Sequence, residues 1–197
     1  MSTPTKTARF ELVPIRLEGP KLIQPKVFGD ARGFFSESYR RNELAELGIP
    51  EEFVQDNHSR SGHGVLRGMH FQVGAGMSKL VRVSRGRIID VVVDLRRGSP
   101  TYGQWEGYEI SDENHRQVYC PIGFAHGFVV LSEIADVNYK CSGYYDESIE
   151  RGITFADPDV GIAWPTDIEL QTSERDAGAP RLAEIADSLP FVYEAGR

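Results

Sequence analysis

Short apolar segments recur along almost the whole chain, and they limit the possible folds more than any other feature of the sequence. Each segment is rich in β-branched and aromatic residues, and Gly, Pro, Asp or Ser separates it from the next. The segments are residues 21–28, 33–39, 52–59, 65–72, 79–86, 87–96, 105–110, 116–121, 126–131, 136–145 and 152–155. Their spacing is typical of the strands of a β-sandwich or barrel. The segment RIIDVVVDLR, residues 87–96, is the most hydrophobic and is predicted to be a central strand.

Helical patterns are scarce. Residues 41–48, RNELAELG, combine good helix formers with a stop signal at Gly48, and residues 180–189, PRLAEIADSL, predict a second short helix. So many strands with so few helices exclude a parallel α/β fold and favour an antiparallel double sheet. We therefore predict an all-β fold, a jelly-roll barrel of the cupin type with a few short helices.

One domain accounts for the length of the chain. A chain of 197 residues can bury a sizeable core without disulfide or metal staples. We expect residues 1–8 to be flexible, residues 9–180 to form the core of the barrel, and residues 181–197 to form a C-terminal helix and tail.

Composition narrows the classes of function. The net charge of −7 argues against nonspecific binding to nucleic acid, although it leaves room for a local basic pocket. No apolar run approaches the roughly twenty residues of a membrane helix, and the first ten residues lack the apolar stretch of a signal peptide. Two cysteines, Cys120 and Cys141, are too few for a disulfide framework and are predicted to be buried thiols. We expect a soluble cytoplasmic protein.

Three charged or titratable residues interrupt the apolar pattern between residues 64 and 86. Arg67, His70 and Lys79 need either solvent or a charged ligand, because a charge that leaves water loses free energy. Strand alternation puts His70 on one face and Arg67 on the other. Only a β-bulge, for which Gly68 is the plausible site, would aim both side chains into one pocket.

Part of a metal-binding pattern is present. Many jelly-roll barrels hold a metal through two histidines separated by one residue, a nearby carboxylate and a third histidine on a later strand. Here His70 and His126 are in place, but Gln72 stands at the second histidine and Gly76 and Met77 at the acidic position. Two imidazoles do not complete the usual site for Zn²⁺ or Fe²⁺, so we predict no metal.

Other residues could make this pocket an acid–base site. A histidine oriented by a carboxylate is a general base, a tyrosine can be the acid, and a lysine can stabilise an oxyanion. The segments YKCSGYY and SERD supply Tyr139, Tyr145, Arg175 and Asp176. Spacing is equally compatible with structural roles, in which Tyr139 packs in the core and Asp176 caps the C-terminal helix.

A series of ordered segments carries a family resemblance from about Ile23 to about Leu182. The segments are FGDARGFFSESY, FVQDNHSRS, GVLRGMHFQ, KLVRV, DVVVDLRRGSPTYGQW, PIGFAHGFVVLSE, YKCSGYY and DPDVGIAWP. With these segments in this order, the chain resembles the dTDP-4-dehydrorhamnose 3,5-epimerases, cupin-fold enzymes that act on a nucleotide-linked 4-keto-6-deoxy sugar. The resemblance implies an isomerase that inverts C3 and C5 through an enolate, with no cofactor.

The resemblance also implies roles for individual residues. His70 matches the base, Asp176 its carboxylate partner, Tyr139 the proton donor on the opposite face of the sugar and Lys79 the support of the enolate oxygen. Tyr145 matches an aromatic side chain that stacks on thymine. Further ligand contacts are implied for Arg32, Glu37, Gln55, Asn57, Arg67, His126, Glu150 and Arg175. The neighbouring subunit typically lends Arg32 and Glu37, which implies a homodimer with exchanged N-terminal strands.

Three alternatives stay open at this level. A mono-epimerase, which inverts C3 or C5 of a related dTDP-4-keto-6-deoxy sugar, would use the same groups. A sugar-nucleotide-binding module without turnover would need no acid–base pair. A metal-dependent cupin oxygenase or isomerase would depend on a bound ion.

Overall fold

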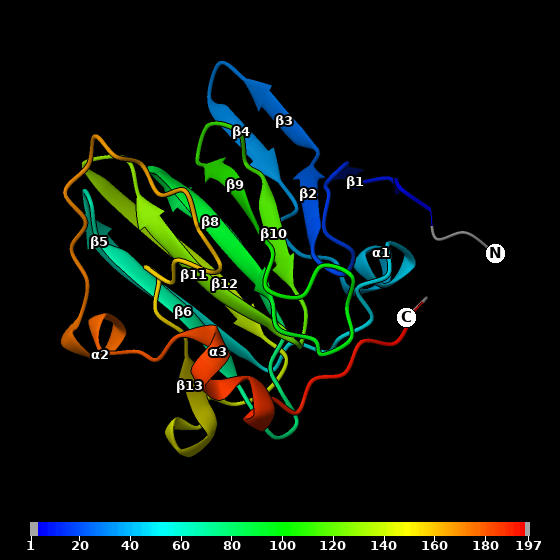
Figure 1. Ribbon diagram of the computed structural model, residues 1–197. Coiled ribbons are helices and arrows are strands. Elements are labelled where there is room, and N and C mark those ends of the chain that lie inside the picture. The colour runs from blue at the N-terminus through cyan, green and yellow to red at the C-terminus, as the bar shows by residue number, and fades with distance from the viewer. Residues whose placement is uncertain (1–3, 196–197) are drawn as a thin grey trace.

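The computed structural model describes residues 4–195, and within that range two antiparallel sheets and one hairpin contain the named strands (Figure 1). The larger sheet contains, in spatial order, β1 (Phe10–Val13), β2 (Lys21–Pro25), β10 (Gln117–Cys120), β7 (Lys79–Arg85), β12 (Ile134–Cys141) and β5 (Gln55–Gly62). The smaller sheet contains β13 (Glu150–Gly152), β6 (Leu66–Gln72), β11 (Phe124–Val130), β8 (Arg87–Asp94) and β9 (Trp105–Ser111). The hairpin pairs β3 (Val27–Asp30) with β4 (Gly33–Ser36).

The main apolar core lies between the two sheets. Val81 and Val83 of β7 meet Val92 of β8 and Phe128 of β11 in one buried cluster. Strand β8 lies between β11 and β9, as its hydrophobicity predicts. The all-β, jelly-roll fold with a few short helices is confirmed.

The sequence pattern misplaced some strand boundaries. The segment 21–28 is split, because the chain leaves the larger sheet after Pro25 and begins the hairpin at Val27. The segment 136–145 ends as a strand at Cys141. Strand β1 was not predicted, since its four residues are too few to give a clear alternation.

Short helices lie between some of the strands and after the last one. The elements are α1 (Arg41–Glu46), η1 (Glu147–Ile149), α2 (Glu174–Ala177), α3 (Leu182–Ile185) and η2 (Ala186–Ser188). Both predicted helices are present, and the first is followed by Gly48 with a φ of 79°. Helix α2 was not predicted. No helix of the described residues is long and apolar enough to cross a bilayer.

The N-terminal segment is in part hydrogen-bonded to β1. Leu12 donates its backbone N–H to Thr5, and Thr7 donates to Phe10. Residues 1–3 lie outside the described residues, so flexibility of residues 1–8 and the domain boundaries stay predictions.

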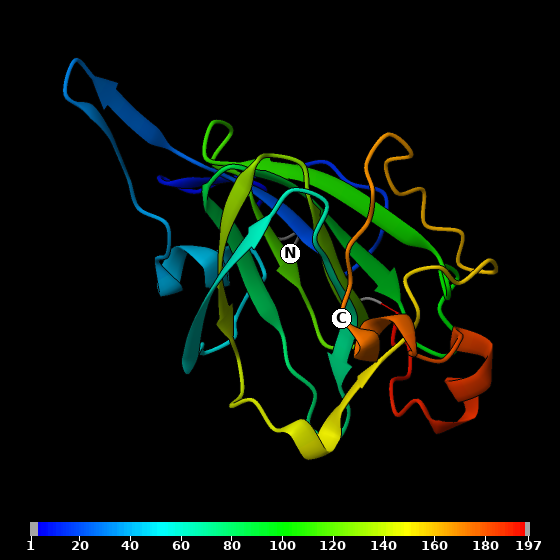
Figure 2. The ribbon, with the colours of Figure 1, turned by 90° about the vertical axis from the view of Figure 1, so that its left-hand side faces the viewer.

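The hairpin of β3 and β4 projects from the body of the protein, as Figures 1 and 2 show from two sides. Three of its side chains are largely exposed although they are aromatic: Phe28 at 44%, Phe34 at 63% and Phe35 at 63%. An apolar surface of this kind is a candidate for contact with another chain.

A β-bulge in β6 places Arg67 and His70 on the same side of the sheet. His126 of β11 lies opposite His70, but Phe128 lies opposite Arg67, so β6 carries one extra residue between these pairs. Gly68 lies within this irregularity with a φ of 138°, and a Cβ there would meet the Cα of Gly127 at 2.6 Å. The predicted bulge is confirmed, and both side chains line the space between the sheets.

The close approach of the two strands at the bulge predicts a stability effect. A Cβ at Gly127 would lie 2.6 Å from the Met69 sulfur and 2.8 Å from the Arg67 carbonyl oxygen. Gly127→Ala should therefore lower the free energy of unfolding by about 1–3 kcal/mol in chemical denaturation. Gly143→Ala is the matched control, because its new methyl group would meet nothing closer than 3.9 Å. Equal stability of the two variants would contradict this account of the bulge.

Candidate active site

A cavity of about 600 Å³ opens between the two sheets, next to the segment of residues 171–176. Both sheets and α2 contribute to its wall. The predicted site residues that line it are Arg67, His70, Lys79, His126, Tyr139, Tyr145, Glu150, Arg175 and Asp176. The fold thus brings together side chains from β6, β7, β11, β12, β13, α2 and the loop after β12.

Asp176 holds the imidazole of His70. Its Oδ1 lies 2.8 Å from His70 Nε2, and its Oδ2 accepts the backbone N–H of Gly68 at 3.2 Å. Helix α2 presents this carboxylate, which is only 6% exposed, and Ser173 caps the helix by accepting the N–H of Asp176. A proton on Nε2 faces the carboxylate, which leaves the lone pair on Nδ1. The alternative in which Asp176 caps the C-terminal helix is wrong.

Tyr139 stands on β12 in the larger sheet, whereas His70 stands on β6 in the smaller one. Its ring packs against the main core, and the residue also lines the cavity. Burial raises the pKa of the Tyr139 phenol above its ordinary value, and a hydrogen bond with Asn57 opposes this shift only in part. The phenol is therefore in its proton-donating form at neutral pH.

Lys79 carries a positive charge on the same wall as Tyr139. On β10 and β12, the two strands that flank β7, the residues opposite Lys79 are Cys120 and Cys141. Both are buried free thiols, as predicted. Burial raises the pKa of Cys120 to about 12 and the pKa of Cys141 above its ordinary value, so both thiols are neutral at neutral pH. Lys79 forms no salt bridge with any residue between positions 4 and 195. Its ammonium group is therefore available to a negative charge in the cavity.

Asp90 is a site residue that the sequence reasoning missed. It is fully buried on β8, and its Oδ2 lies 2.8 Å from Nε2 of His126. Its other oxygen has no hydrogen-bond partner among the described residues. Because His126 lies directly across from His70, two imidazoles stand side by side, each held by a carboxylate. The signal in the sequence was an acidic residue in the middle of the most hydrophobic strand.

The side chains at the mouth of the cavity are linked to one another. Tyr145 donates its hydroxyl to Oε2 of Glu150 at 2.9 Å, and Arg175 lies 2.6 Å from the same oxygen. Arg67, which is also exposed, donates to the hydroxyl of Ser61 at 3.0 Å. The arrangement offers two guanidinium groups and a half-exposed aromatic ring to a ligand.

Four predicted residues lie outside the cavity lining. Gln55 and Asn57 are next to it on β5, where Gln55 accepts the backbone N–H of Tyr145 at 3.0 Å. Arg32 is at the tip of the hairpin, paired with Asp30. Glu37 pairs instead with Arg9 and Arg40, at 2.9 and 3.1 Å. A single chain does not bring Arg32 or Glu37 to the cavity.

The donor set of the cavity does not resemble a metal centre. Among residues 4–195, no three side chains of His, Cys, Asp or Glu are grouped to hold an ion. Gln72, at the position expected for a second histidine, donates to the carbonyl of Asp146 at 3.3 Å.

Comparison with known proteins gives closely similar relatives. The family model described as dTDP-4-dehydrorhamnose 3,5-epimerase matches residues 14–184. An enzyme of that name from Pseudomonas aeruginosa is 51% identical over 170 residues, which cover 86% of this chain and 93% of the relative. A dTDP-4-dehydrorhamnose 3-epimerase from Streptomyces niveus is 44% identical over 181 residues, covering 91% and 87%.

A solved structure also matches this chain over most of its length. A dTDP-6-deoxy-D-glucose-3,5-epimerase from Legionella pneumophila, crystallised with dTDP-4-keto-L-rhamnose, superposes with a TM-score of 0.91 at 47% identity. The match covers 94% of this chain and all of the other.

The environment of Tyr139 predicts its titration. Because burial raises the pKa of this phenol, the neutral form persists above the ordinary value of 10.0. The ultraviolet absorbance of tyrosinate should be followed against pH for the wild type and Tyr139→Phe. The component that the substitution removes should titrate above pH 10.0. A component that ionises below that pH would contradict the buried setting of the ring.

Proposed function

Because the chain belongs to the dTDP-4-dehydrorhamnose 3,5-epimerase family and is thus an isomerase, we propose that it converts dTDP-4-dehydro-6-deoxy-D-glucose into dTDP-4-dehydro-L-rhamnose. One observation carries the proposal. His70, with its carboxylate, and the protonated phenol of Tyr139 line the same cavity from different sheets. A keto sugar between them would meet a base on one face and an acid on the other.

The ketone of the substrate makes this chemistry possible. C3 and C5 both flank the C4 carbonyl, so removal of either proton gives an enolate with its charge on the ketone oxygen. The base and the acid must act on opposite faces of the ring, since protonation from the first face regenerates the starting configuration. Preorganised positive charge near the oxygen lowers the barrier, and the loss of one such donor typically costs on the order of 10²–10³ in rate.

The residues divide these tasks among themselves. Nδ1 of His70 takes the proton from carbon while Asp176 stabilises the imidazolium that forms. Tyr139 then delivers its phenolic proton to the same carbon from the other side. Lys79 stabilises the enolate oxygen, because its ammonium group lies on the wall of the cavity without a carboxylate partner. His126, held by Asp90, lies beside His70 on the opposite wall.

The nucleotide and diphosphate bind at the mouth. Arg67 and Arg175 supply positive charge for the phosphates, and the ring of Tyr145, which is 49% exposed, offers a face for the thymine base. Glu150, Gln55 and Asn57 supply hydrogen-bonding groups around it.

The partner that completes the site is a second copy of the chain. Arg32 and Glu37 lie on or beside the projecting hairpin rather than at the cavity of their own chain. A homodimer that exchanges its N-terminal strands would deliver both residues to the neighbouring cavity, and the exposed hairpin aromatics support such a contact.

The reaction needs no metal or cofactor in this proposal. The carbonyl of the substrate already acidifies both protons. The donor set supports this view, since His70 and His126 are each held by their own carboxylate.

A mono-epimerase is the second candidate. The relative from Streptomyces niveus is named a 3-epimerase, and inversion at one carbon uses the same base and acid. Position-resolved isotope exchange separates the two functions.

Turnover in D₂O tests which carbons react. The purified protein should introduce deuterium at both C3 and C5 of the product, because each new hydrogen comes from a solvent-exchanged donor. Nuclear magnetic resonance of the product locates the label. Deuterium at one carbon alone would assign the protein as a mono-epimerase, and none at either would contradict epimerisation.

Removal of the base tests catalysis against mere binding. His70→Ala should lower kcat by at least about 10²-fold, while the affinity for dTDP stays within a few-fold of the wild type. His63→Ala is the control, since this exposed histidine does not line the cavity. If binding falls in parallel with activity, the base role is wrong and a binding module is favoured.

Mixed dimers test whether Arg32 acts across subunits. Arg32→Ala and His70→Ala chains should each be nearly inactive alone, but co-refolding equal amounts should restore about a quarter of the wild-type activity. Each mixed dimer then has one complete site, with His70 from one chain and Arg32 from the other. No recovery in dimers that contain both chains would contradict the shared site.

A further inference from the structure

The guanidinium of Arg67 is held by a neutral hydroxyl rather than by a carboxylate. Its Nε donates to Oγ of Ser61 at 3.0 Å, and Arg67 forms no salt bridge within residues 4–195. Arg175, which also lines the cavity, lies instead 2.6 Å from Glu150. The protein therefore anchors the side chain of Arg67 without neutralising its charge.

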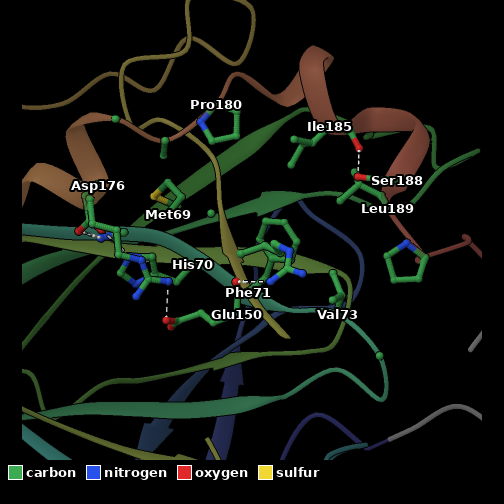
Figure 3. A pocket seen from close by; sticks show the side chains of 18 residues that line it. Met69, His70, Phe71, Val73, Glu150, Asp176, Pro180, Ile185, Ser188 and Leu189 are labelled. Carbon is green, nitrogen blue, oxygen red and sulfur yellow. Dashed lines mark hydrogen bonds and ion pairs between the residues drawn. The ribbon is translucent and has the colours of Figure 1, made fainter. Parts of the chain in front are cut away.

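The carboxylates next to β6 are already engaged elsewhere. Figure 3 shows Asp176 and Glu150 near the ring of His70, with dashed lines that mark their interactions. Asp176 holds the imidazole of His70, and Glu150 pairs with Arg175. In the described part of the chain, the hydroxyl of Ser61 is thus the only hydrogen-bond partner of the Arg67 side chain.

Ser61 itself does not reach the cavity. It is only 6% exposed, and it is absent from the cavity wall that Arg67 helps to form. Because Ser61 lies on β5 and Arg67 on β6, their hydrogen bond joins the larger sheet to the smaller one. A ligand in the cavity would not contact this hydroxyl, so any effect of Ser61 on binding has to act through Arg67.

The hydrogen bond leaves the end of the guanidinium free for a ligand. Ser61 occupies Nε, whereas Nη1 and Nη2 have no acceptor among residues 4–195. The parallel N–H bonds of these two nitrogens match two oxygens of a phosphate group. A side chain that is already fixed also loses less conformational entropy when the ligand binds.

We propose that Ser61 is a positioning residue that aims the guanidinium of Arg67 at the diphosphate of the bound nucleotide sugar, an inference that rests on the proposed function. A hydroxyl suits this task because it fixes the arginine without competing with the phosphates for its charge. A carboxylate at the same place would offset part of that charge.

The same anchor keeps Arg67 near the proposed acid. Burial raises the pKa of the Tyr139 phenol, and the positive charge of Arg67 lowers this pKa in part. If the anchor were lost and the guanidinium moved away, the pKa of Tyr139 would rise further. A general loosening of the two sheets would instead hydrate the ring and lower its pKa. The direction of the shift therefore separates a positioning role from a structural one.

Binding of dTDP, measured by isothermal titration calorimetry, tests the inference. Ser61→Ala should weaken the affinity on the order of tenfold, because a hydrogen bond to a charged group is lost. Ser61→Thr keeps the hydroxyl and should bind like the wild type. The matched control is Ser84→Ala, which removes an exposed hydroxyl of β7 outside the cavity and should also bind like the wild type. Ser61→Cys is a second test in case Ser61→Ala does not fold.

A double variant shows whether Ser61 acts through Arg67. Arg67→Ala should weaken dTDP binding at least as much as Ser61→Ala does. Adding Ser61→Ala to Arg67→Ala should then cause no further loss, because the group that Ser61 positions is already absent. A further loss in the double variant would overturn the inference, since Ser61 would then act on the fold.

Titration of Tyr139 provides a second measurement. The ultraviolet absorbance of tyrosinate should be compared between Ser61→Ala and the same variant with Tyr139→Phe added. The component that Tyr139→Phe removes should titrate at a higher pH than the corresponding component of the wild type. A shift to lower pH would contradict the positioning role.

The outcomes separate this inference from the function on which it rests. If the wild type binds dTDP and both Ser61→Ala and Ser61→Cys bind it equally well, the positioning role is wrong and the proposed function stands. If the wild type does not bind dTDP, the proposed function itself fails, and the inference fails with it.

Discussion

The carboxylate of Asp176 is the interaction on which the proposed site depends. It accepts one hydrogen bond from the backbone at Gly68 and one from the imidazole of His70, so it ties α2 to the bulge and to the base at once. Burial of this carboxylate without these donors would be strongly unfavourable. The two hydrogen bonds therefore fix the position of the Asp176 side chain against β6. The bulge, in turn, lets Arg67 and His70 share a cavity.

The two sheets give this cavity its chemical asymmetry. One wall presents His70 and His126 with their carboxylates, and the other presents Tyr139 and Lys79. A protein with a net charge of −7 thus contains a local set of cations that suits a sugar diphosphate and a transient oxyanion.

Sequence patterns predicted the elements well and the contacts between them less well. Alternation and turn residues identified most strands, and Gly68 correctly indicated a bulge because only an irregularity could reconcile the positions of Arg67 and His70. The pairing of His70 with Asp176 spans 106 residues, so no local pattern could predict it, and only the family resemblance supplied it. Asp90 was missed because its partner His126 lies on a different strand.

A crystal structure with a bound dTDP-hexose tests the central claim most directly. The account predicts that Nδ1 of His70 and the hydroxyl of Tyr139 lie on opposite faces of the sugar ring, each about 3–3.5 Å from C3 or C5. The ketone oxygen should point toward Lys79. A sugar with both groups on one face, or with either of them out of reach of the ring, would contradict the mechanism.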